Sequence, residues 1–561
     1  MGSKKMIKSK LISSLEKAFA DNKIEDFSEL SHISVLRGER LSFQLLHTQT
    51  GEDSTWMLYA PLSISGELGK LAVARDVCNL PVTKPINPGA YDDNYLRITP
   101  GIYPDLLRPM HRGGYAVIAR DTLSSIWIDL TVPRDFAAGE HKIKVCLDGE
   151  ARGFGKIEHT LTVEVIDAAL PEQTLINTEW FHCDSLASYY GVEVWSERHW
   201  EIIESFMRVA VKNGQNMILT PVFTLALDTA PGGERLTHQL VGVTKSADGY
   251  SFDFSLLDRW IELCNKVGFK YFEISHFFTQ WGAQHAPKIM ATVGGEYRRI
   301  FGWDTDAHGE EYRIFLRSFV GAFLSHMKAR GDDGRCYFHI SDEPSLEHIE
   351  SYAKSKAVVA DLLEGYTIMD AMSKYEYIER GVADVAIPAN NHIEPFIENN
   401  VSKLWTYYCC GQSVDVSNRL IAMPSYRTRS MGMQMYKYNI VGFLQWGYNF
   451  YQNYHSLDSI NPFVDLSGDD WVPAGDICSV YPSQSGEALE SLRLVVFNEG
   501  LQDMRAMQLL EEFIPHEEIV HQIESAFGKK IKFDVCATSA AQMLAVREKV
   551  NELIKKAVKS K

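Results

Sequence analysis

The spacing of hydrophobic residues changes character near residue 170 of the chain. Before that point, apolar and polar residues alternate along short segments, most clearly in SIWIDLTVP, HKIKVCLDG and HTLTVEVID (residues 125–167). Turn-forming stretches such as AAGE and GEARGFG separate these segments. A period of two places alternate side chains on opposite faces of a strand. We therefore predict an N-terminal antiparallel β-sandwich domain over residues 1–170.

Beyond residue 170, short apolar runs alternate with amphipathic helical stretches. We predict eight strands, at residues 174–182, 216–222, 271–277, 336–341, 366–371, 382–388, 403–409 and 440–448. Most are separated by helical patterns such as EEYRIFLRSFVGAFLSHMKARG, which ends at Gly331, a residue suited to a helix C-cap. Eight strand–helix repeats predict a (β/α)8 TIM-barrel catalytic domain over residues 171–484.

Residues 485–561 have a helical pattern, and we expect them to form a C-terminal helical region packed on the barrel. The predicted fold class is thus mixed β and α/β. With 561 residues, of which 45% are hydrophobic, the chain is large enough for at least two ordered domains.

Charge and cysteine content exclude several classes of partner. Lys and Arg total 56 against 73 Asp and Glu, a net charge of −17, so no basic face is expected for nucleic acid. The nine cysteines form no CxxC pair, which argues against a disulfide scaffold and a structural zinc site. We predict no metal and no other cofactor.

No run of 18 apolar residues occurs, and no apolar segment of signal-peptide length precedes the polar EKAFADNKIEDFSE near the N-terminus. From these features we expect a cytoplasmic, reduced protein without a membrane partner.

The active site of a TIM barrel forms where strands end and the following loops begin. The residues at these positions are Trp180, His182, Asp184, Asp228, His276, Trp281, Asp342, Glu343, Asp370, Asn390, Asn391, Trp405, Tyr407, Tyr408, Trp446, Tyr448 and Asn449. They are mostly aromatic or acidic, with no obvious cation to hold a phosphate. Motifs such as HExxH, GxxxxGK and GxSxG are absent. Aromatic faces with carboxylates and amides favour a sugar ligand.

Two adjacent acids, Asp342 and Glu343, follow the fourth predicted strand in YFHISDEPSLEHI. Acids before a helix often only favour the positive end of the helix dipole, with Ser345 as the cap. At a barrel strand end they can instead form a catalytic pair. Core packing likewise remains an alternative for Trp405 and Trp446.

A retaining glycosidase usually needs two carboxyl groups roughly 5 Å apart across the sugar. The seventh strand, KLWTYYCC, supplies no acid at its end. A 2-acetamido group of the substrate could replace the missing nucleophile, which leaves the protein to supply one acid/base and one carboxylate that orients the amide. Two adjacent acids in unlike environments fit this division, with the proton donor in a partly desolvated pocket.

The segment HISDEP resembles the Asp-Glu pair of glycoside hydrolase family 123, the β-N-acetylgalactosaminidase family. Further segments that look like this family are NTEWFHCDSLASYYGVEVWSERHW, NMILTPVFTLALDT, ISHFFTQWGAQHAPKI, FLQWGYNFYQ, DICSVYP and SLRLVVFNEGLQDMRAM. The resemblance implies substrate-assisted retention, with Glu343 as the general acid/base and Asp342 positioning the acetamido group.

We thus expect a retaining exo-β-N-acetylhexosaminidase that removes terminal β-linked N-acetylgalactosamine from oligosaccharides or glycoconjugates. By position and type, the residues expected to bind the sugar are Trp180, His182, Asp184, His276, Asn391, Tyr407, Trp446, Tyr448 and Asn449. The alternatives are a non-catalytic carbohydrate-binding protein on the same scaffold and a glycosidase for sugars without an acetamido group.

Overall fold

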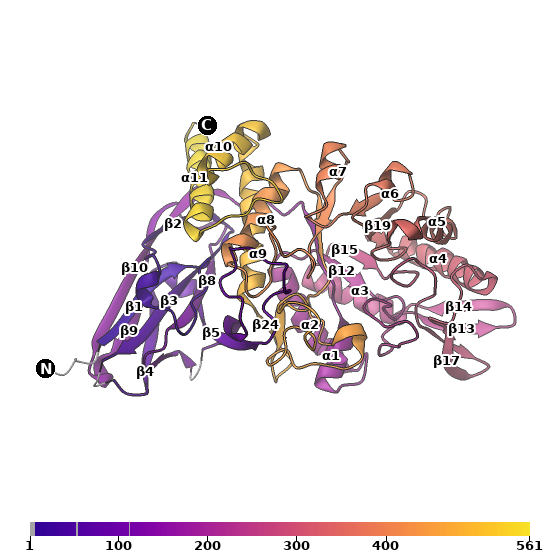
Figure 1. Cartoon of the computed structure of the whole chain (residues 1–561), viewed down its shortest axis with the longest axis horizontal. Helices are drawn as coiled ribbons and strands as arrows, with labels where there is room; N and C mark the ends of the chain where they lie inside the picture. The colour runs from indigo at the N-terminus through magenta and orange to yellow at the C-terminus, as the bar shows by residue number, and fades with distance from the viewer. Residues whose placement is uncertain (1–5, 52–53, 111–112, 561) are drawn as a thin grey trace.

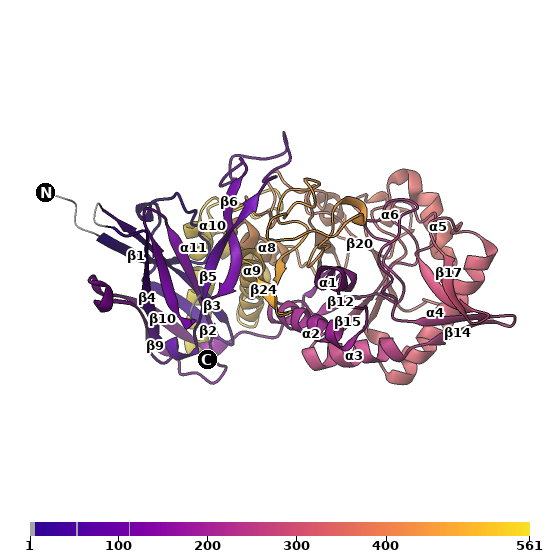
Figure 2. The same ribbon diagram turned by 90° about the horizontal axis from the view of Figure 1, so that it is seen from below.

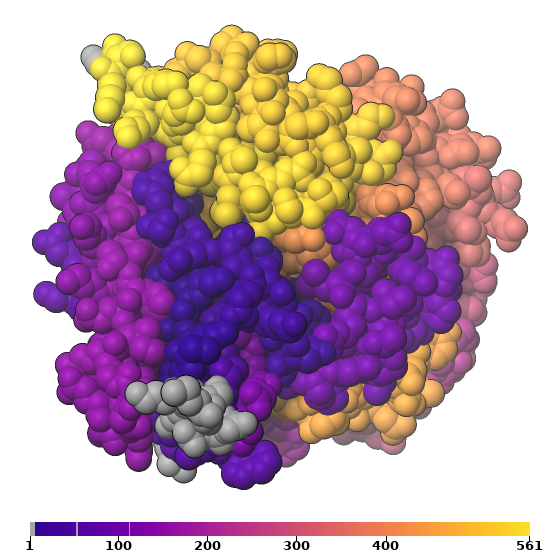
Figure 3. Space-filling view, turned by 60° about the vertical axis from the view of Figure 1, so that its left-hand side comes forward, coloured from indigo at the N-terminus to yellow at the C-terminus, as the bar shows by residue number. Residues whose placement is uncertain are grey.

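The computed structural model describes residues 6–51, 54–110 and 113–560. An all-β N-terminal lobe and a barrel lie next to each other along the long axis (Figure 1). The last helices, coloured yellow, extend from the N-terminal lobe to the orange part of the barrel (Figure 3).

The N-terminal lobe contains two five-stranded sheets. The first has the order β1 (Met6–Ser13), β3 (Arg40–Thr50), β8 (Ser124–Thr131), β5 (Val73–Val82) and β6 (Gly101–Pro109). The second has the order β2 (His32–Arg37), β10 (Gly155–Ala169), β9 (Gly139–Gly149), β4 (Met57–Ser65) and β7 (Tyr115–Ala119). All neighbouring strands are antiparallel except β2 and β10, which run parallel. The predicted sandwich is confirmed.

Alternate side chains of strand β8 pack on opposite faces of the first sheet. Ile126, Ile128 and Leu130 pack into the apolar core between the two sheets. Trp127, on the opposite face, belongs to the large apolar cluster of the barrel lobe. Asp129 on that same face accepts a 2.7 Å hydrogen bond from Arg75. The outer face of this sheet is therefore buried against the barrel lobe.

The barrel has eight strands joined in parallel pairs. They are β11 (Ile176–Glu179), β12 (Met217–Thr220), β15 (Tyr271–Ile274), β18 (Cys336–Phe338), β19 (Thr367–Ala371), β20 (Val385–Ile387), β21 (Trp405–Tyr407) and β22 (Gly442–Gln445). Between β20 and β21 the ring closes through two hydrogen bonds, from Tyr407 N to Pro388 O (3.1 Å) and from Asn390 N to Tyr407 O (2.9 Å). The predicted TIM barrel is confirmed as a nearly closed ring.

Helices follow each strand of the barrel. They are α1 (Cys183–Tyr190), α2 (Glu197–Lys212), α3 (Ser255–Val267), α4 (Glu310–Arg330), α5 (Ile349–Ala357), α6 (Glu376–Glu379), α7 (Glu394–Glu398), α8 (Ser425–Lys437) and α9 (Leu492–Leu510). Helix α9 follows the eighth strand in chain order and packs on α8. A Cβ on Gly432 would lie 2.0 Å from Gly500 O, so only glycine permits this close crossing.

Two hairpins that we did not predict from the sequence interrupt the repeats after β12 and β15. Strands β13 (Gly242–Ser246), β14 (Gly249–Asp253), β16 (Ile289–Val293) and β17 (Glu296–Phe301) form a separate four-stranded sheet. This sheet projects at the end of the molecule farthest from the sandwich (Figures 1 and 2).

The chain ends in helices α10 (His516–Phe527) and α11 (Ala540–Lys559), after a short hairpin of β23 (Val480–Pro482) and β24 (Ala488–Glu490). Helix α11 also contacts the sandwich, because Ser34 Oγ in β2 donates to Glu548 Oε2 (2.6 Å) and accepts from Asn551 Nδ2 (2.8 Å). The predicted domain boundaries stay predictions. None of the described helices combines the length and the apolar character needed to cross a membrane.

Candidate active site

A cavity of about 200 Å³ opens at the carboxyl ends of the barrel strands. Its walls come from strand ends and the loops that follow them: Trp180, Asp228, Gln280, Trp281, Asp342, Glu343, Ala371, Tyr407, Cys409, Cys410, Leu444, Trp446, Tyr454 and Trp471. The volume lies below the roughly 300–1,000 Å³ common for drug-sized ligands, so the cavity suits a small ligand such as a single sugar.

Asp342 and Glu343 are held by backbone bonds to both neighbouring strand ends. Trp281 N, after β15, donates to Asp342 O (3.1 Å), and Glu343 N donates to Ala371 O (3.1 Å) at the end of β19. Glu343 adopts a left-handed backbone conformation with φ of +44°. Such a conformation costs a non-glycine residue about 1–3 kcal/mol and is typical of functional sites. The two backbone hydrogen bonds therefore hold the loop in a strained conformation and fix the positions of the two side chains.

The two acids occupy unlike environments. Asp342 is buried, with 4% of its surface exposed, and its Oδ2 accepts a 2.8 Å hydrogen bond from Gln280 Nε2. Burial first, and then the charge of Glu343, raise the pKa of Asp342 well above its ordinary value. Glu343 is exposed, and its Oε1 accepts a 2.6 Å hydrogen bond from the Tyr407 hydroxyl. We expected Glu343 to be the desolvated acid; the structure instead buries Asp342, because Asp342 points inward beside Gln280.

Asp228 is a third carboxyl group on the cavity wall. It lies in the loop after β12, with φ of +48°, and its N–H donates to Gln280 Oε1. Gln280 thus links the backbone of Asp228 to the side chain of Asp342. Removal from bulk water raises the pKa of Asp228 to about 7, with smaller contributions from Arg235, which lowers it, and Glu343, which raises it.

Trp446 and Trp471 form an aromatic wall, with ring centroids 5.5 Å apart. Trp446 Nε1 donates a 2.9 Å hydrogen bond to Asp476, which also accepts from the backbone N–H of Cys410 (2.9 Å). Burial raises the pKa of Asp476 to about 6. The orientation of the Trp446 ring is thus fixed by a buried acid behind the wall.

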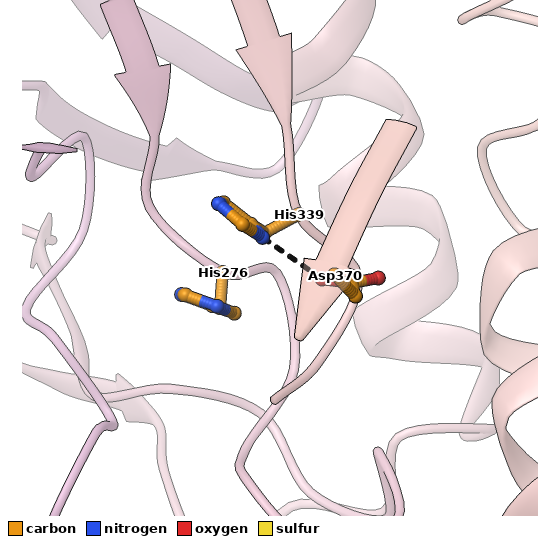
Figure 4. A group of neighbouring side chains, drawn as sticks. All are labelled: His276, His339 and Asp370. Carbon is orange, nitrogen blue, oxygen red and sulfur yellow. Dashed lines mark hydrogen bonds and ion pairs between the residues drawn. The ribbon is translucent and has the colours of Figure 1, made fainter. Parts of the chain in front are cut away.

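A buried network lies beneath the cavity floor. His339 donates from Nδ1 to Asp370 (2.9 Å) and from Nε2 to Glu273 (2.7 Å), while Trp180 Nε1 donates to Glu273 (2.7 Å). Although burial lowers the pKa of His339, the hydrogen bonds to Asp370 and Glu273 outweigh it and raise that pKa to about 10. His339 is therefore an imidazolium at neutral pH, and Figure 4 shows the His276 ring lying parallel to it, with centroids 4.2 Å apart.

His276, His339 and Asp370 also offer ligand atoms within 4.8 Å of one another. Both nitrogens of His339 are already bonded to carboxylates. The lone pairs of two stacked imidazole rings run side by side and do not converge on one point. The donor set fits a buried ion pair better than a metal centre, and we assign it no ion.

Five of the eleven residues predicted for the site line the cavity: Trp180, Asp342, Glu343, Tyr407 and Trp446. The other six do not. His182, Asp184, Tyr448 and Asn449 are fully buried, His276 lies beneath the floor, and Asn391 is exposed outside the cavity.

The residues behind the wall support it. His182 Nε2 donates to Trp446 O (2.8 Å), Asn449 Nδ2 donates to His182 O (3.1 Å), and the Tyr448 hydroxyl donates to Phe206 O (2.8 Å). Asp184 forms a 2.8 Å ion pair with Arg235. These side chains lie within a few residues of a strand end but do not line the cavity. Their predicted contact with the sugar is therefore wrong, and their role is to support the wall.

Several wall residues were not chosen from the sequence. Asp228 and Trp281 were among the strand-end residues, and that position was the only sequence signal for them. Gln280 carries no motif. Tyr454 and Trp471 lie in the long loop after β22 and return to the cavity from a distance that no local pattern encodes.

Residues 180–510 match the family model of the glycoside hydrolase 123 catalytic domain, which is more than half of the chain. The chain belongs to glycoside hydrolase family 123. The resemblance inferred from the sequence is confirmed, and the protein is a glycosidase. A search of curated proteins found no match.

Among solved structures, a family 123 glycoside hydrolase from Clostridium perfringens is similar over the whole fold. The TM-score is 0.73 at 16% identity, covering 99% of this chain and 98% of that one. A family 39 glycoside hydrolase from Bacteroides cellulosilyticus matches with a TM-score of 0.31 at 11% identity, covering 74% of this chain and 78% of that one. The first match shows that the two-lobed architecture is shared within family 123.

Proposed function

We propose that this family 123 enzyme is a retaining exo-β-N-acetylhexosaminidase that removes terminal N-acetylgalactosamine by substrate-assisted catalysis. The observation that carries the proposal is the pairing of a buried Asp342 with an exposed Glu343 in one small cavity. A group that orients an amide must reach the sugar's interior face, whereas a group that exchanges protons with the leaving group and with water must lie at the open side.

In the first step, the acetamido carbonyl oxygen of the substrate attacks the anomeric carbon. Asp342, as a carboxylate, accepts the hydrogen bond of the acetamido N–H and stabilises the positive charge that develops there. Glu343 donates its proton to the departing oxygen. In the second step Glu343 removes a proton from water, which opens the bicyclic intermediate with retention.

Gln280 and Tyr407 have supporting roles in this scheme. Gln280 Nε2 holds one oxygen of Asp342 and leaves the other free for the substrate amide. The Tyr407 hydroxyl donates to Glu343 Oε1 (2.6 Å), which orients that carboxyl group.

A set of 4-nitrophenyl β-glycosides that differ at C2 and C4 tests the proposal. The 2-acetamido galactoside should be hydrolysed fastest, and its 2-hydroxy counterpart should be nearly inert. Good turnover of the 2-hydroxy galactoside would remove the acetamido group from the mechanism.

The second candidate is a glycosidase that uses a protein nucleophile. Asp228 favours it, because its carboxyl group lines the same cavity as Glu343 and has no hydrogen-bond donor of its own among the described residues. A covalent sugar–Asp228 adduct, trapped with a 2-fluoro glycoside and located by peptide mass spectrometry, would establish this mechanism.

The Clostridium perfringens relative is described by its hydrolysis of glycolipid glycans. We propose a glycoconjugate of that class, with a terminal β-linked N-acetylhexosamine, as the substrate here. A cytoplasmic location is part of the same proposal, and the nine cysteines, all present as free thiols, support a reducing compartment. Cell fractionation of the source organism tests the location.

A further inference from the structure

The cavity wall carries acids and no cation. Asp228, Asp342 and Glu343 line it together with aromatic, amide, thiol and apolar side chains. Within the described parts of the chain, no lysine, arginine or histidine is on this wall. A negatively charged substituent on a bound sugar would therefore meet three carboxyl groups and no partner of opposite sign.

Asp228 differs from the other two acids in how it is held. Its backbone is fixed on both sides, because its N–H donates to Gln280 and its carbonyl accepts from Ser456 Oγ (2.8 Å). Its carboxylate accepts no hydrogen bond from any described residue. No described residue therefore contacts the Asp228 carboxylate with a compensating charge or hydrogen bond, and Asp228 lines the cavity.

The charged and titratable groups around Asp228 are Arg235, Asp342, Glu343, Asp476 and His455. Arg235 is fully buried and paired with Asp184, and it lowers the pKa of Asp228 only partly. Burial, Glu343 and Asp476 raise that pKa, to about 7 in total. His455 adjoins Ser456, and its ring packs on Tyr454 and Trp281. Asp228 therefore carries its charge above about pH 7 and loses it below.

We propose that Asp228 is a specificity-determining residue that makes the cavity reject sugars with an anionic substituent and favour a cationic ligand. The inference rests on the proposed function and narrows its substrate class to terminal sugars without sulfate, phosphate or carboxylate groups. The physical reason is that like charges a few ångströms apart in a partly water-excluded cavity repel strongly, and the wall offers nothing to offset the repulsion.

The first test compares 4-nitrophenyl N-acetyl-β-galactosaminide with its 6-sulfate in the wild type and in Asp228→Asn. Asparagine tolerates positive φ as well as aspartate does, so the substitution removes charge with little change in the backbone. The wild type should prefer the neutral substrate, and the ratio of the two kcat/KM values should fall about tenfold or more in the variant.

Asp458→Asn is the matched control, because it removes one charge from an exposed position of the same loop as Ser456 and should leave the ratio unchanged. In the wild type the preference should be larger at about pH 8.5 than at about pH 5.5, and this additional dependence should shrink in Asp228→Asn. An unchanged ratio in Asp228→Asn, or equal hydrolysis of both substrates by the wild type, would overturn the inference.

The second test does not need turnover. Calorimetry would measure the binding of a protonated galacto-configured 2-acetamido iminosugar and of its uncharged lactam. Asp228→Asn should lower the affinity for the protonated iminosugar about tenfold and the affinity for the lactam much less. Equal losses would make Asp228 a plain hydrogen-bond acceptor and refute the inference. If the binding pattern holds but the neutral glycoside is not cleaved, the proposed function fails and the inference stands.

Discussion

At the scale of single residues, Asp342 and Glu343 share a peptide bond but not an environment. Asp342 lies inside, bonded to Gln280, whereas Glu343 is exposed and bonded to Tyr407. The left-handed backbone at Glu343 is what turns the two side chains to different positions. Such a division matches two different tasks in one reaction.

The two acids should therefore differ in their dependence on the leaving group. Glu343→Ala should lower kcat/KM on an unactivated glycoside by about 10²–10⁴-fold, the usual contribution of general acid catalysis, and recover on a dinitrophenyl glycoside that needs no proton. Asp342→Ala should stay impaired on both, because the acetamido group must attack in either case. The comparison uses kcat/KM, since water attack can limit kcat. Equal recovery of both variants would contradict the assigned roles.

The buried carboxyl group of Asp342 should also lower the free energy of unfolding at neutral pH. Its pKa is raised in the folded state, so between the unfolded pKa of about 3.9 and the higher folded pKa the native protein keeps a proton that the unfolded chain has lost. Stability therefore falls as pH rises through this interval, above which Asp342 is the carboxylate that the proposed mechanism uses. Asp342→Asn should raise the apparent Tm at about pH 8 by about 1–2 °C, and the gain should fade toward about pH 4.

Differential scanning calorimetry across this pH range measures the effect. The exposed Asp458→Asn serves as control and should show no such pH-dependent gain. A lower Tm of Asp342→Asn at about pH 8 would mean that the carboxylate stabilises the fold through Gln280.

At the scale of elements, the crossing of α8 and α9 depends on two glycines. A side chain at Gly432 would collide with the backbone of Gly500. Helix α9 also packs on β22, where the rings of Phe497 and Phe443 have centroids 4.8 Å apart. Helix α9 also carries Arg493, so its position matters for the contact between the lobes.

Gly432→Ala should lower the free energy of unfolding by about 1–3 kcal/mol or more, as expected for overpacking a tight interface. Gly321→Ala in α4 is the matched control, since an added Cβ there meets no atom within 4 Å. That variant should be about 0.5–1 kcal/mol more stable, because alanine is the better helix former. Urea denaturation of the wild type and the two variants measures these free energies of unfolding. Equal effects of the two substitutions would show that α8 and α9 can move apart to accommodate the added Cβ.

At the scale of the whole molecule, the sandwich and the barrel share a buried polar interface. Arg493 in α9 forms a 2.8 Å ion pair with Asp105 in β6, and both side chains are fully buried. Arg493 also donates to the carbonyls of Gly475 (2.6 Å) and Cys478 (2.9 Å), which belong to the loop behind the cavity. The sandwich thus helps to hold the loop that carries Trp471.

Arg493→Met should destabilise the protein by about 3–5 kcal/mol, since it leaves Asp105 buried without its cation. The exposed pair of Arg313 with Glu310 provides the control, and Arg313→Met should change stability by less than about 1 kcal/mol. Calorimetry should show one transition for the wild type and a split or broadened transition for Arg493→Met, because the lobes then unfold separately. An unchanged profile would show that the apolar contacts alone join the lobes.

Local patterns were sufficient to predict the architecture. Alternating residues in segments such as β8 and β9 predict a sandwich, and apolar runs separated by helices predict a barrel, because each strand carries its own burial pattern. The place of Asp342 and Glu343 on the cavity wall was also predictable, since their position after the fourth strand is a property of the chain order. The four-stranded sheet of β13, β14, β16 and β17 was missed because its strands are short and mostly exposed.

The sequence by itself thus determined the two lobes, the order of the barrel strands and the place of Asp342 and Glu343. Only the tertiary structure decided which strand-end side chains face the cavity, placing Trp180 and Tyr407 on its wall and Tyr448 in the core. The tertiary structure also decided which acid is buried and brought Trp471 to the wall. The physical reason is that side-chain direction after a strand, and the return of a long loop, depend on contacts between segments far apart in the chain.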